Sequence, residues 1–294
     1  MRSILIFSLI LRHDTRTLRS PSRSRAKRDR ELGTLTWLEE GQGQPLILLH
    51  GIGSDAGSWG SQFTAFSATR RVLAWNAPGY ATSSPLEGGP KNPTRYAELL
   101  AESLNALNVG TCAIVGHSLG ALTAARFMRL YPDRVSALLL SSPASGYGQE
   151  EQDDLLPALK ERLTDVETLG PAGMAAKRAA RTLSPGAGPD LVHQAAEAMA
   201  RVSITGYRDA VTLLSRGSLS ADLSALPRDK IRLITAEHDQ IIKPERVHAL
   251  AEERHLPSPT VIAHAGHASY LENPSGFTAA IEACLASVAA SDEA

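Results

Sequence analysis

The segment Cys112-Ala-Ile-Val-Gly-His-Ser-Leu-Gly-Ala-Leu122 is the most informative part of the chain for its fold class. It joins a short apolar run, typical of a buried strand, to a helical pattern that continues to Leu130. Ser118 lies between the two, and Gly116 and Gly120 on either side lack the Cβ atoms that would crowd a sharp turn. The motif G-x-S-x-G is weak by itself, but a strand, a turn and a helix in this order are typical of a nucleophile elbow, which exposes a serine hydroxyl.

Similar apolar runs recur along the chain and alternate with helical patterns, which predicts βαβ units around a mainly parallel sheet. The expected strands are 46–49, 72–75, 112–115, 135–140, 231–235 and 260–263. The expected helices between and after them are 94–107, 119–130, 244–253 and 274–289. The predicted fold class is therefore α/β, with helices flanking the sheet.

Between Ser142 and Leu226 the strand pattern stops. Helices are expected there at 150–163, 171–182, 189–201 and 205–214, separated by Gly-Pro and Pro-Gly pairs. Because open α/β sheets bind ligands at their carboxyl edge, this helical insert, residues 143–226, is interpreted as a cap over that edge. The core then comprises residues 31–142 and 227–294. A separate helical domain with no role in the site is the alternative.

Residues 1–30 differ in composition from the remainder. They hold nine Lys and Arg against two Asp, a net charge of +7, so the rest of a chain whose total is −1 carries −8. The apolar run at 4–11 is too short for a membrane span, which needs about 20 residues, and no small-x-small cleavage site follows it. Residues 1–30 are therefore interpreted as a disordered or targeting extension, or as the product of a start codon upstream of the native one.

The composition, with 43% apolar and 21% charged residues among 294, is that of a globular protein with ample chain for a core. An acidic body does not attract phosphate backbones, so nucleic acid is not expected as a partner. Cys112 and Cys284 fit no Cys-x-x-Cys spacing and are expected to be buried free thiols, which favours a reducing, cytoplasmic location. The nine His show no metal-ligand spacing, so neither a metal nor a cofactor is expected.

A serine hydroxyl is a poor nucleophile unless a base takes its proton and a third group orients that base. Asp239 follows the strand expected at 231–235, and His267 follows the strand expected at 260–263. Parallel strands bring their carboxyl ends to one edge of a sheet, so both side chains are expected to meet Ser118 there.

The motif His50-Gly51-Ile52-Gly53 follows the first expected strand. A tetrahedral intermediate develops negative charge on an oxygen, and backbone N–H groups at such a turn stabilise that charge. The donors expected are the N–H groups of Ile52 and Leu119. Because the backbone supplies the interaction, the side chain of Ile52 matters little, whereas the flanking glycines permit the turn.

Together these segments resemble the α/β-hydrolase superfamily over about residues 35–289. The matching segments are HGIG at 50–53, NAPGY at 76–80, GHSLG around Ser118, HDQIIKP around Asp239 and GHASYLENP around His267. The order Ser, Asp, His along the chain is that of α/β-hydrolases. The resemblance implies the α/β-hydrolase fold with a helical cap inserted after the sixth strand. It also implies a Ser-His-Asp catalytic triad, an oxyanion hole and no cofactor.

The sequence departs from this family pattern at three positions. Asn76 stands where many relatives have Asp, and Ala81 stands where a Gly is common, so the local turn is expected to differ. Ala268 follows the proposed base, whereas relatives that cleave carbon–carbon bonds often carry Trp there.

The expected reaction is hydrolysis of a small-molecule carboxylic ester, lactone or thioester, of the EC 3.1.1 type for esters, through an acyl-enzyme on Ser118. His267 removes the proton of the serine, and Asp239 holds His267 in the required tautomer. Two alternatives stay open: a carbon–carbon bond hydrolase, which Ala268 disfavours, and a ligand-binding relative with little turnover. The sequence does not determine the oligomeric state.

Other polar residues near the motifs are expected to be structural. His117 should point away from the serine hydroxyl, His264 should support its own loop, and Glu237 is the alternative acid if Asp239 is misassigned. His238 is likewise not expected to be the base. The arginines Arg178, Arg181 and Arg201 of the insert are interpreted as a solvated helix face rather than a carboxylate site.

Overall fold

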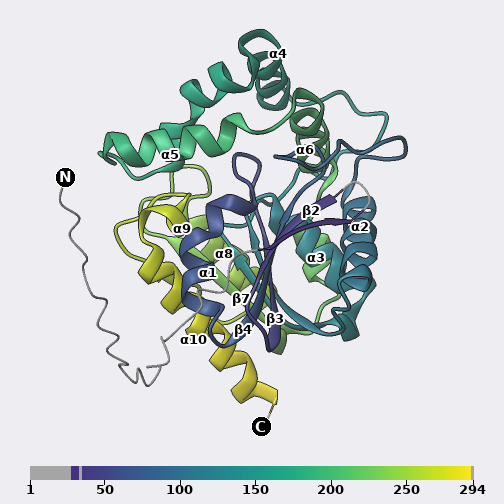
Figure 1. Cartoon of the computed structure of the whole chain (residues 1–294), viewed down its shortest axis with the longest axis vertical. Coiled ribbons are helices and arrows are strands. Elements are labelled where there is room, and N and C mark those ends of the chain that lie inside the picture. Colours follow the sequence, from purple (N-terminus) through teal and green to yellow (C-terminus); the bar gives the residue numbers. More distant parts are fainter. Residues whose placement is uncertain (1–27, 33–34, 293–294) are drawn as a thin grey trace, which may run out of the picture.

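The computed structural model describes residues 28–32 and 35–292 (Figure 1). Within them, a single sheet has the strand order β1-β2-β4-β3-β5-β6-β7-β8. The strands are β1 (Arg28–Leu32), β2 (Leu35–Glu40), β3 (Gln44–Leu49), β4 (Arg70–Asn76), β5 (Cys112–His117), β6 (Val135–Ser141), β7 (Ile231–Ala236) and β8 (Thr260–Ile262). The apolar run at 4–11 and most of the expected extension lie outside the described residues.

The sheet is mainly parallel, as predicted. Strands β4, β3, β5, β6, β7 and β8 pair in parallel, whereas β1 and β2 are antiparallel additions at one edge. All six strands expected from the sequence are present. Most of their side chains are buried on both faces, as in β5, where every residue is buried, whereas Val261 of the edge strand β8 is exposed. Burial on both faces explains why these strands read as unbroken apolar runs.

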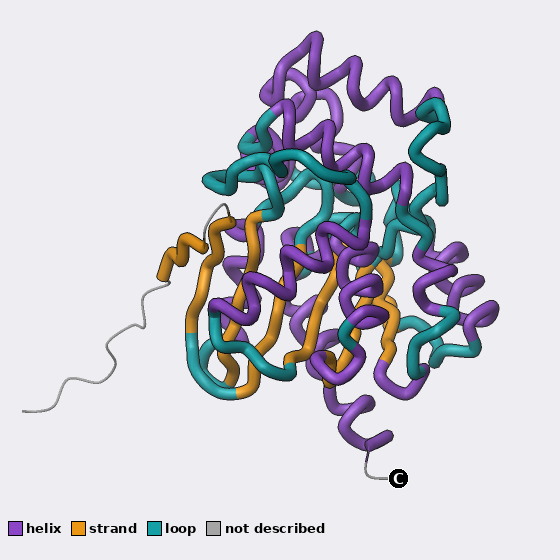
Figure 2. Tube along the Cα trace, turned by 90° about the vertical axis from the view of Figure 1, so that its right-hand side faces the viewer, coloured by secondary structure: helices purple, strands orange, loops and turns teal. Residues whose placement is uncertain are grey.

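Helices cover both faces of the sheet (Figures 1 and 2). In the core they are α1 (Gly60–Phe66), α2 (Pro93–Ala106), α3 (Gly120–Leu130), α8 (Pro244–Arg254), α9 (Ser269–Glu272) and α10 (Pro274–Asp292). Helices α2 and α3 pack together on one face, and α1 and α10 pack together on the other. Proline occupies the first turn of α2 and α8, where its missing N–H leaves no bond unmade.

The helical insert lies between β6 and β7. Its helices are α4 (Pro157–Arg178), the short η3 (Ala179–Thr182), α5 (Pro189–Ala200), α6 (Ile204–Arg216) and α7 (Leu219–Leu223). Helices α4, α5 and α6 lie beyond one end of the sheet in both views (Figures 1 and 2). These three helices therefore lie at an edge of the sheet rather than against one of its faces, whereas α7 packs against α3 and α8.

The helix expected at 150–163 is wrong at both ends, because the observed helix runs from Pro157 to the kink at Gly170, whereas the break expected at 170–171 is right. The helix expected at 150–163 begins only at Pro157, because residues before it form a turn in which the Asp153 carboxylate accepts the Glu150 N–H at 2.8 Å. The expected break at Gly170-Pro171 is present inside α4, where Gly170 has φ 67° and ψ 173°. Glycine adopts this conformation without a steric penalty, so the chain bends there.

The expected thiols Cys112 and Cys284 are free and buried. Among the described residues, the helices are each too short or too polar to cross a membrane.

Candidate functional site

The predicted order of strand, sharp turn and helix is present between β5 and α3. Ser118 has φ 51°, in the left-handed region. A Cβ on Gly120 would lie 2.4 Å from the Leu49 carbonyl oxygen, and one on Gly116 would lie 2.9 Å from the Cα of Ala121. Both glycines are therefore required for the close approach of strand, turn and helix.

The second part of the site joins the loops that follow β7 and β8. The Nδ1–H of His267 donates to Asp239 Oδ2 at 2.8 Å. The other oxygen of Asp239 accepts the N–H groups of Ile241 and Ile242 at 2.8 and 2.9 Å. These contacts fix the carboxylate and, through it, the orientation of the imidazole.

The electrostatics of Asp239 favour its ionised form. Burial by itself raises the pKa of this carboxyl. The charge and hydrogen bond of His267 and the hydrogen bond from the Ile242 N–H together lower the pKa by more than burial raises it, so the pKa lies below its ordinary value. An ionised carboxylate accepts but does not donate, so His267 carries its proton on Nδ1 and has Nε2 free to accept.

Ser118 and His267 line one cavity of about 640 Å³, although no hydrogen bond joins the two side chains. The expected oxyanion donors Ile52 and Leu119 line the same cavity. Among the described residues, neither of their N–H groups donates to a protein acceptor. Two backbone donors are thus free to bind a ligand oxygen beside the serine.

The loop after β3 is held by His50. Its Nδ1–H donates to the Gly51 carbonyl at 2.8 Å, and its Nε2 accepts the Ala77 N–H at 3.1 Å. Burial lowers the pKa of His50, which keeps the ring neutral and able to make both bonds. A Cβ on Gly51 would lie 3.0 Å from the Ser118 Cβ, and one on Gly53 would lie 2.6 Å from Met199 Cε. The two glycines of the motif therefore permit close packing of this loop against Ser118 and Met199.

His117 makes a contact that the sequence does not reveal. Its Nε2–H donates to the main-chain carbonyl of His267 at 2.9 Å, and the centroids of the two imidazole rings lie 4.8 Å apart. Burial lowers the pKa of His117 to about 3, so the ring is neutral. His117 makes no hydrogen bond to the Ser118 hydroxyl, in line with the expectation that it points elsewhere. The partners lie 150 positions apart, so no local signal predicts the bond.

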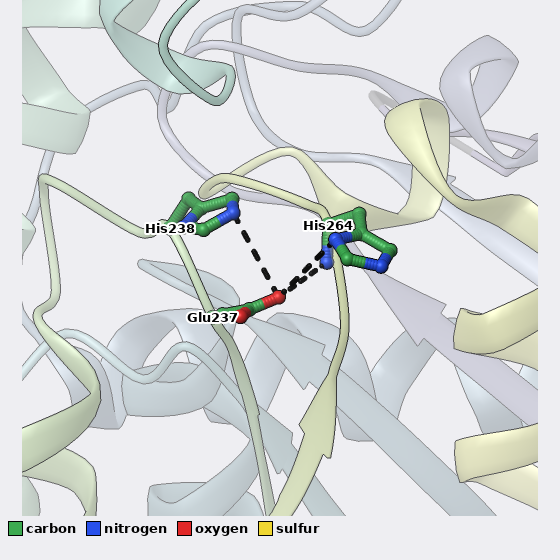
Figure 3. A group of neighbouring side chains, drawn as sticks. All are labelled: Glu237, His238 and His264. Atoms are coloured by element: carbon green, nitrogen blue, oxygen red, sulfur yellow. Dashed lines mark hydrogen bonds and ion pairs between the residues drawn. The ribbon is translucent and has the colours of Figure 1, made fainter.

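Glu237, the alternative acid, belongs to a different cluster (Figure 3). Its Oε2 accepts the His264 N–H at 2.8 Å and lies 3.5 Å from His264 Nδ1 and 3.7 Å from His238 Nε2. It makes no hydrogen bond to His267. The ligand atoms of the three residues lie within 4.8 Å of one another, so among the described residues this is the group that could hold a metal ion. Sequence spacing does not reveal it because its members come from two loops.

The arginines of the insert are only partly explained by the sequence. Arg178 is 12% exposed and pairs with the buried Asp165, so its interpretation as a solvated residue is wrong. Arg201 is half-exposed and pairs with the buried Asp55 of the core. Arg181 is exposed, as expected. All three arginines line the cavity between the insert and the core.

Comparison with known proteins gives matches along most of the chain. A family model described as the alpha/beta hydrolase fold matches residues 44–274. The (E)-2-((N-methylformamido)methylene)succinate hydrolase of Acinetobacter baylyi is 28% identical over 138 residues, which are 46% of this chain and 52% of that protein. The chain thus spans about half the length of this curated relative.

Solved structures match over nearly their whole length. A thermophilic esterase from Thermogutta terrifontis has a TM-score of 0.75 at 24% identity, and the match covers 90% of this chain and 99% of that one. The enol-lactonase from Burkholderia xenovorans has a TM-score of 0.73 at 19% identity, covering 86% and 96%. At these identities the structures show the shared fold. With the family model matching well over half of its residues, the chain belongs to the α/β-hydrolase family.

Proposed function

We propose that the protein is a serine hydrolase that cleaves a carboxylic ester, lactone or thioester through an acyl-enzyme on Ser118. The observation that carries the proposal is a convergence in one cavity. A serine in a left-handed turn, a histidine bonded to a buried carboxylate, and two residues whose backbone N–H groups have no protein acceptor all line it. These are the nucleophile, base, orienting group and oxyanion donors that acyl transfer requires.

In the proposed mechanism, Ser118 Oγ attacks the substrate carbonyl carbon while His267 Nε2 takes the hydroxyl proton. The N–H groups of Ile52 and Leu119 stabilise the oxyanion of the tetrahedral intermediate. When that intermediate collapses, His267 gives its proton to the leaving alcohol or thiol, and the acyl group stays on Ser118. Water then attacks the acyl-enzyme with His267 as base, which releases the acid and restores the serine.

Asp239 has an electrostatic and a positioning role in this mechanism. His267 becomes positively charged in each transition state, and an ionised carboxylate 2.8 Å from Nδ1 stabilises that charge. The depressed pKa of Asp239 keeps the carboxylate ionised at neutral pH, so the proton stays on the histidine.

The insert is proposed to act as a cap over the site. The cavity is lined by core residues such as Gly51 and by insert residues such as Met199 and Tyr207. The loop after β4 is also joined directly to the insert, since the Ser203 N–H donates to the Gly79 carbonyl at 2.9 Å. A cap of this kind excludes water and sets the shape available to the substrate.

Some of the similar proteins are named for ester or lactone chemistry, which is compatible with the proposal. The two structures described above are named as an esterase and an enol-lactonase, and both resemble this chain over nearly their full length. The curated relative from Acinetobacter is also named as a hydrolase.

The test is a substrate panel with matched serine variants. Wild-type protein, Ser118→Ala and Ser145→Ala are assayed on 4-nitrophenyl esters, lactones, thioesters and a vinylogous diketone. Ser145 lines the same cavity, so its variant controls for the loss of a hydroxyl there. We expect turnover of an ester, lactone or thioester that Ser118→Ala abolishes and Ser145→Ala retains. Turnover that survives Ser118→Ala, or cleavage of the diketone alone, contradicts the proposal.

A further inference from the structure

The charged residues that line the cavity are mostly basic, although residues 31–294 as a whole are acidic. Residues 31–294 carry a net charge of −8, yet the cavity is lined by two glutamates, Glu161 and Glu197, and by more arginines than that. The arginines are Arg162, Arg178, Arg181, Arg201 and Arg246. They come from α4, η3 and α8, with Arg201 directly after α5, so the insert and the core both contribute. Positive charge is therefore concentrated at the cavity of an otherwise acidic body.

Two of these arginines are neutralised by protein carboxylates. Arg178 Nε donates to Asp165 at 2.8 Å, and Arg201 donates from two nitrogens to Asp55. By contrast, Arg162, Arg181 and Arg246 form no ion pair with any residue that the structure describes. These three guanidinium groups are available to a ligand.

The two glutamates of the wall do not serve as partners for the unpaired arginines. Glu161 lies 3.6 Å from Arg178 and 3.7 Å from Lys177, and Glu197 lies 3.3 Å from His193. The wall thus carries cationic groups in excess of the acidic groups that could compensate them.

Arg162 is the best placed of the three. It is half-buried, and its guanidinium donates one hydrogen bond, at 3.3 Å, to the hydroxyl of Tyr207, which also lines the cavity. A guanidinium has five N–H donors in a planar fork, so most of its donors are unused. A fork held at a cavity wall with its donors free matches a carboxylate in bidentate geometry. Arg181 and Arg246 are exposed, which suits long-range attraction rather than a fixed contact.

We propose that the cavity takes substrates bearing a carboxylate besides the scissile carbonyl, and that Arg162 binds this carboxylate as the specificity-determining residue. This inference rests on the proposed hydrolase function, because the scissile group must reach Ser118 in the same cavity. Arg181 and Arg246 raise the local concentration of the anionic substrate.

The experiment compares two esters that differ only at the far end of the acyl chain. The mono-4-nitrophenyl ester of adipic acid ends in a carboxylate, and 4-nitrophenyl hexanoate ends in a methyl group on a chain of the same length. We expect wild-type protein to prefer the adipic ester. Arg162→Gln should lower kcat/KM for it by roughly 10- to 100-fold, mainly through KM, since a hydrogen bond to a charged group is lost. Hexanoate hydrolysis should change less than about two-fold on the same scale.

Two further variants make the comparison specific. Arg162→Lys keeps a point charge without the planar fork, so it should restore part of the preference. Arg208→Gln removes an exposed arginine of α6 that pairs with Glu167 away from the cavity, and it should leave both esters unaffected. Circular dichroism and thermal unfolding identify any variant that does not fold, and Arg162→Lys then decides the question.

A binding measurement separates this inference from the proposed function. Isothermal titration of adipate into wild-type protein and Arg162→Gln needs no turnover. Adipate binding that Arg162→Gln abolishes supports the anion site even if no ester, lactone or thioester of the substrate panel is hydrolysed, in which case the hydrolase proposal fails. Equal hydrolysis of the two esters, with equal effects of Arg162→Gln and no adipate binding, overturns the anion site while leaving the hydrolase proposal intact.

Discussion

At the scale of single residues, the site depends on a serine in an unfavourable backbone conformation. The φ of 51° at Ser118 costs an L-residue about 1–2 kcal/mol, and surrounding packing holds it there. The Ser118 N–H donates to the Ser141 carbonyl at 2.9 Å, and its own carbonyl accepts the Ala144 N–H at 3.1 Å. The turn is thus bonded on both sides to the segment that leaves β6.

Replacing Asp239 by Asn tests the role of the buried carboxylate. The amide keeps the size of the side chain but is neutral, and it can donate to His267 and so favour the wrong tautomer. We expect kcat for the preferred ester to fall by about four orders of magnitude, by analogy with serine proteases. Steady-state kinetics measures the effect, with near-ultraviolet circular dichroism as the check on folding. A loss of less than about ten-fold would exclude the proposed role.

His117 gives a prediction about acid stability. Its pKa is about 3 in the folded protein and near its ordinary value of 6.5 in the unfolded chain. Between these values the unfolded state binds more protons, so the free energy of unfolding falls as the pH is lowered. His117→Gln keeps an N–H donor but does not titrate, so it should reduce this slope by up to about 1.4 kcal/mol per pH unit.

The His117 prediction is measured by urea unfolding at several pH values between 4 and 7, about the range that the two pKa values define. His50 has a pKa shifted in the same direction and is present in both proteins, so its contribution cancels in the difference. Parallel stability curves for the wild type and His117→Gln would show that His117 is not held neutral by burial.

Ala81 gives a prediction of the opposite kind, a stabilising substitution. It occupies a position where the family commonly has Gly, and it nevertheless has φ 47°. Ala81→Gly relieves that strain but increases the entropy of the unfolded chain, so we expect a net gain of about 0.5–1 kcal/mol. Thermal and urea unfolding measure it. Ala176→Gly, on the exposed side of α4, is the control and should lose about 1 kcal/mol. A loss of stability in both variants would contradict the strain.

At the scale of elements, the position of the insert depends on a contact between two glycines. A Cβ on Gly206, in the first turn of α6, would lie 2.5 Å from the carbonyl oxygen of Gly79 in the loop after β4. Gly79 itself has φ 80°. The close approach lets the helix dock on the core loop through backbone contacts, which also places cavity residues of α6 such as Tyr207.

Gly206→Ala should therefore separate insert and core. Alanine favours a helix by about 1 kcal/mol, but the clash with backbone atoms outweighs it, and we expect a net loss of about 1–3 kcal/mol. KM for the preferred ester should rise because the cavity wall shifts. Gly110→Ala is the matched control, since a Cβ there meets nothing within 4 Å. Equal stability of the two variants would show that the contact does not determine the docking of α6.

The elements that the sequence predicts are those with a full hydrophobic period or a buried apolar run. Most of the six parallel strands and the helices α2, α3, α8 and α10 belong to this class. Short elements such as α7 and α9 are not predicted, because four or five residues contain too little periodicity to separate them from loops. The prediction places the start of α4 too early for another reason. The Asp153 side chain bonds the backbone of a local turn, and this turn competes with the helix.

At the scale of the whole molecule, the sequence predicts which residues come together at the edge of the sheet better than it predicts the contacts around them. Ser118, Asp239 and His267 each follow a parallel strand, so topology alone brings them to one edge of the sheet. The bond from His117 to the His267 carbonyl and the pairing of Arg178 with Asp165 are tertiary contacts. They depend on how loops and insert pack, and no periodicity or motif encodes them.

The charge distribution is also a property of the whole molecule. In the proposed anion site, an acidic body with arginines around its cavity is expected to attract anionic small molecules to the site rather than to the rest of the surface. The net charge by itself predicts only that polyanions are not attracted. The arginines that line the cavity come from separate parts of the sequence, and they lie together only because the insert packs on the core.

If Ser118 is an activated nucleophile, it should react with a fluorophosphonate, which tags activated serines, and intact-mass spectrometry detects the adduct. Wild-type protein should gain the mass of one adduct, and peptide mapping should locate it on Ser118. Ser118→Ala should gain none, and Asp239→Asn should react much more slowly. A folded wild-type protein that stays unlabelled, or an adduct that persists in Ser118→Ala, would contradict the account.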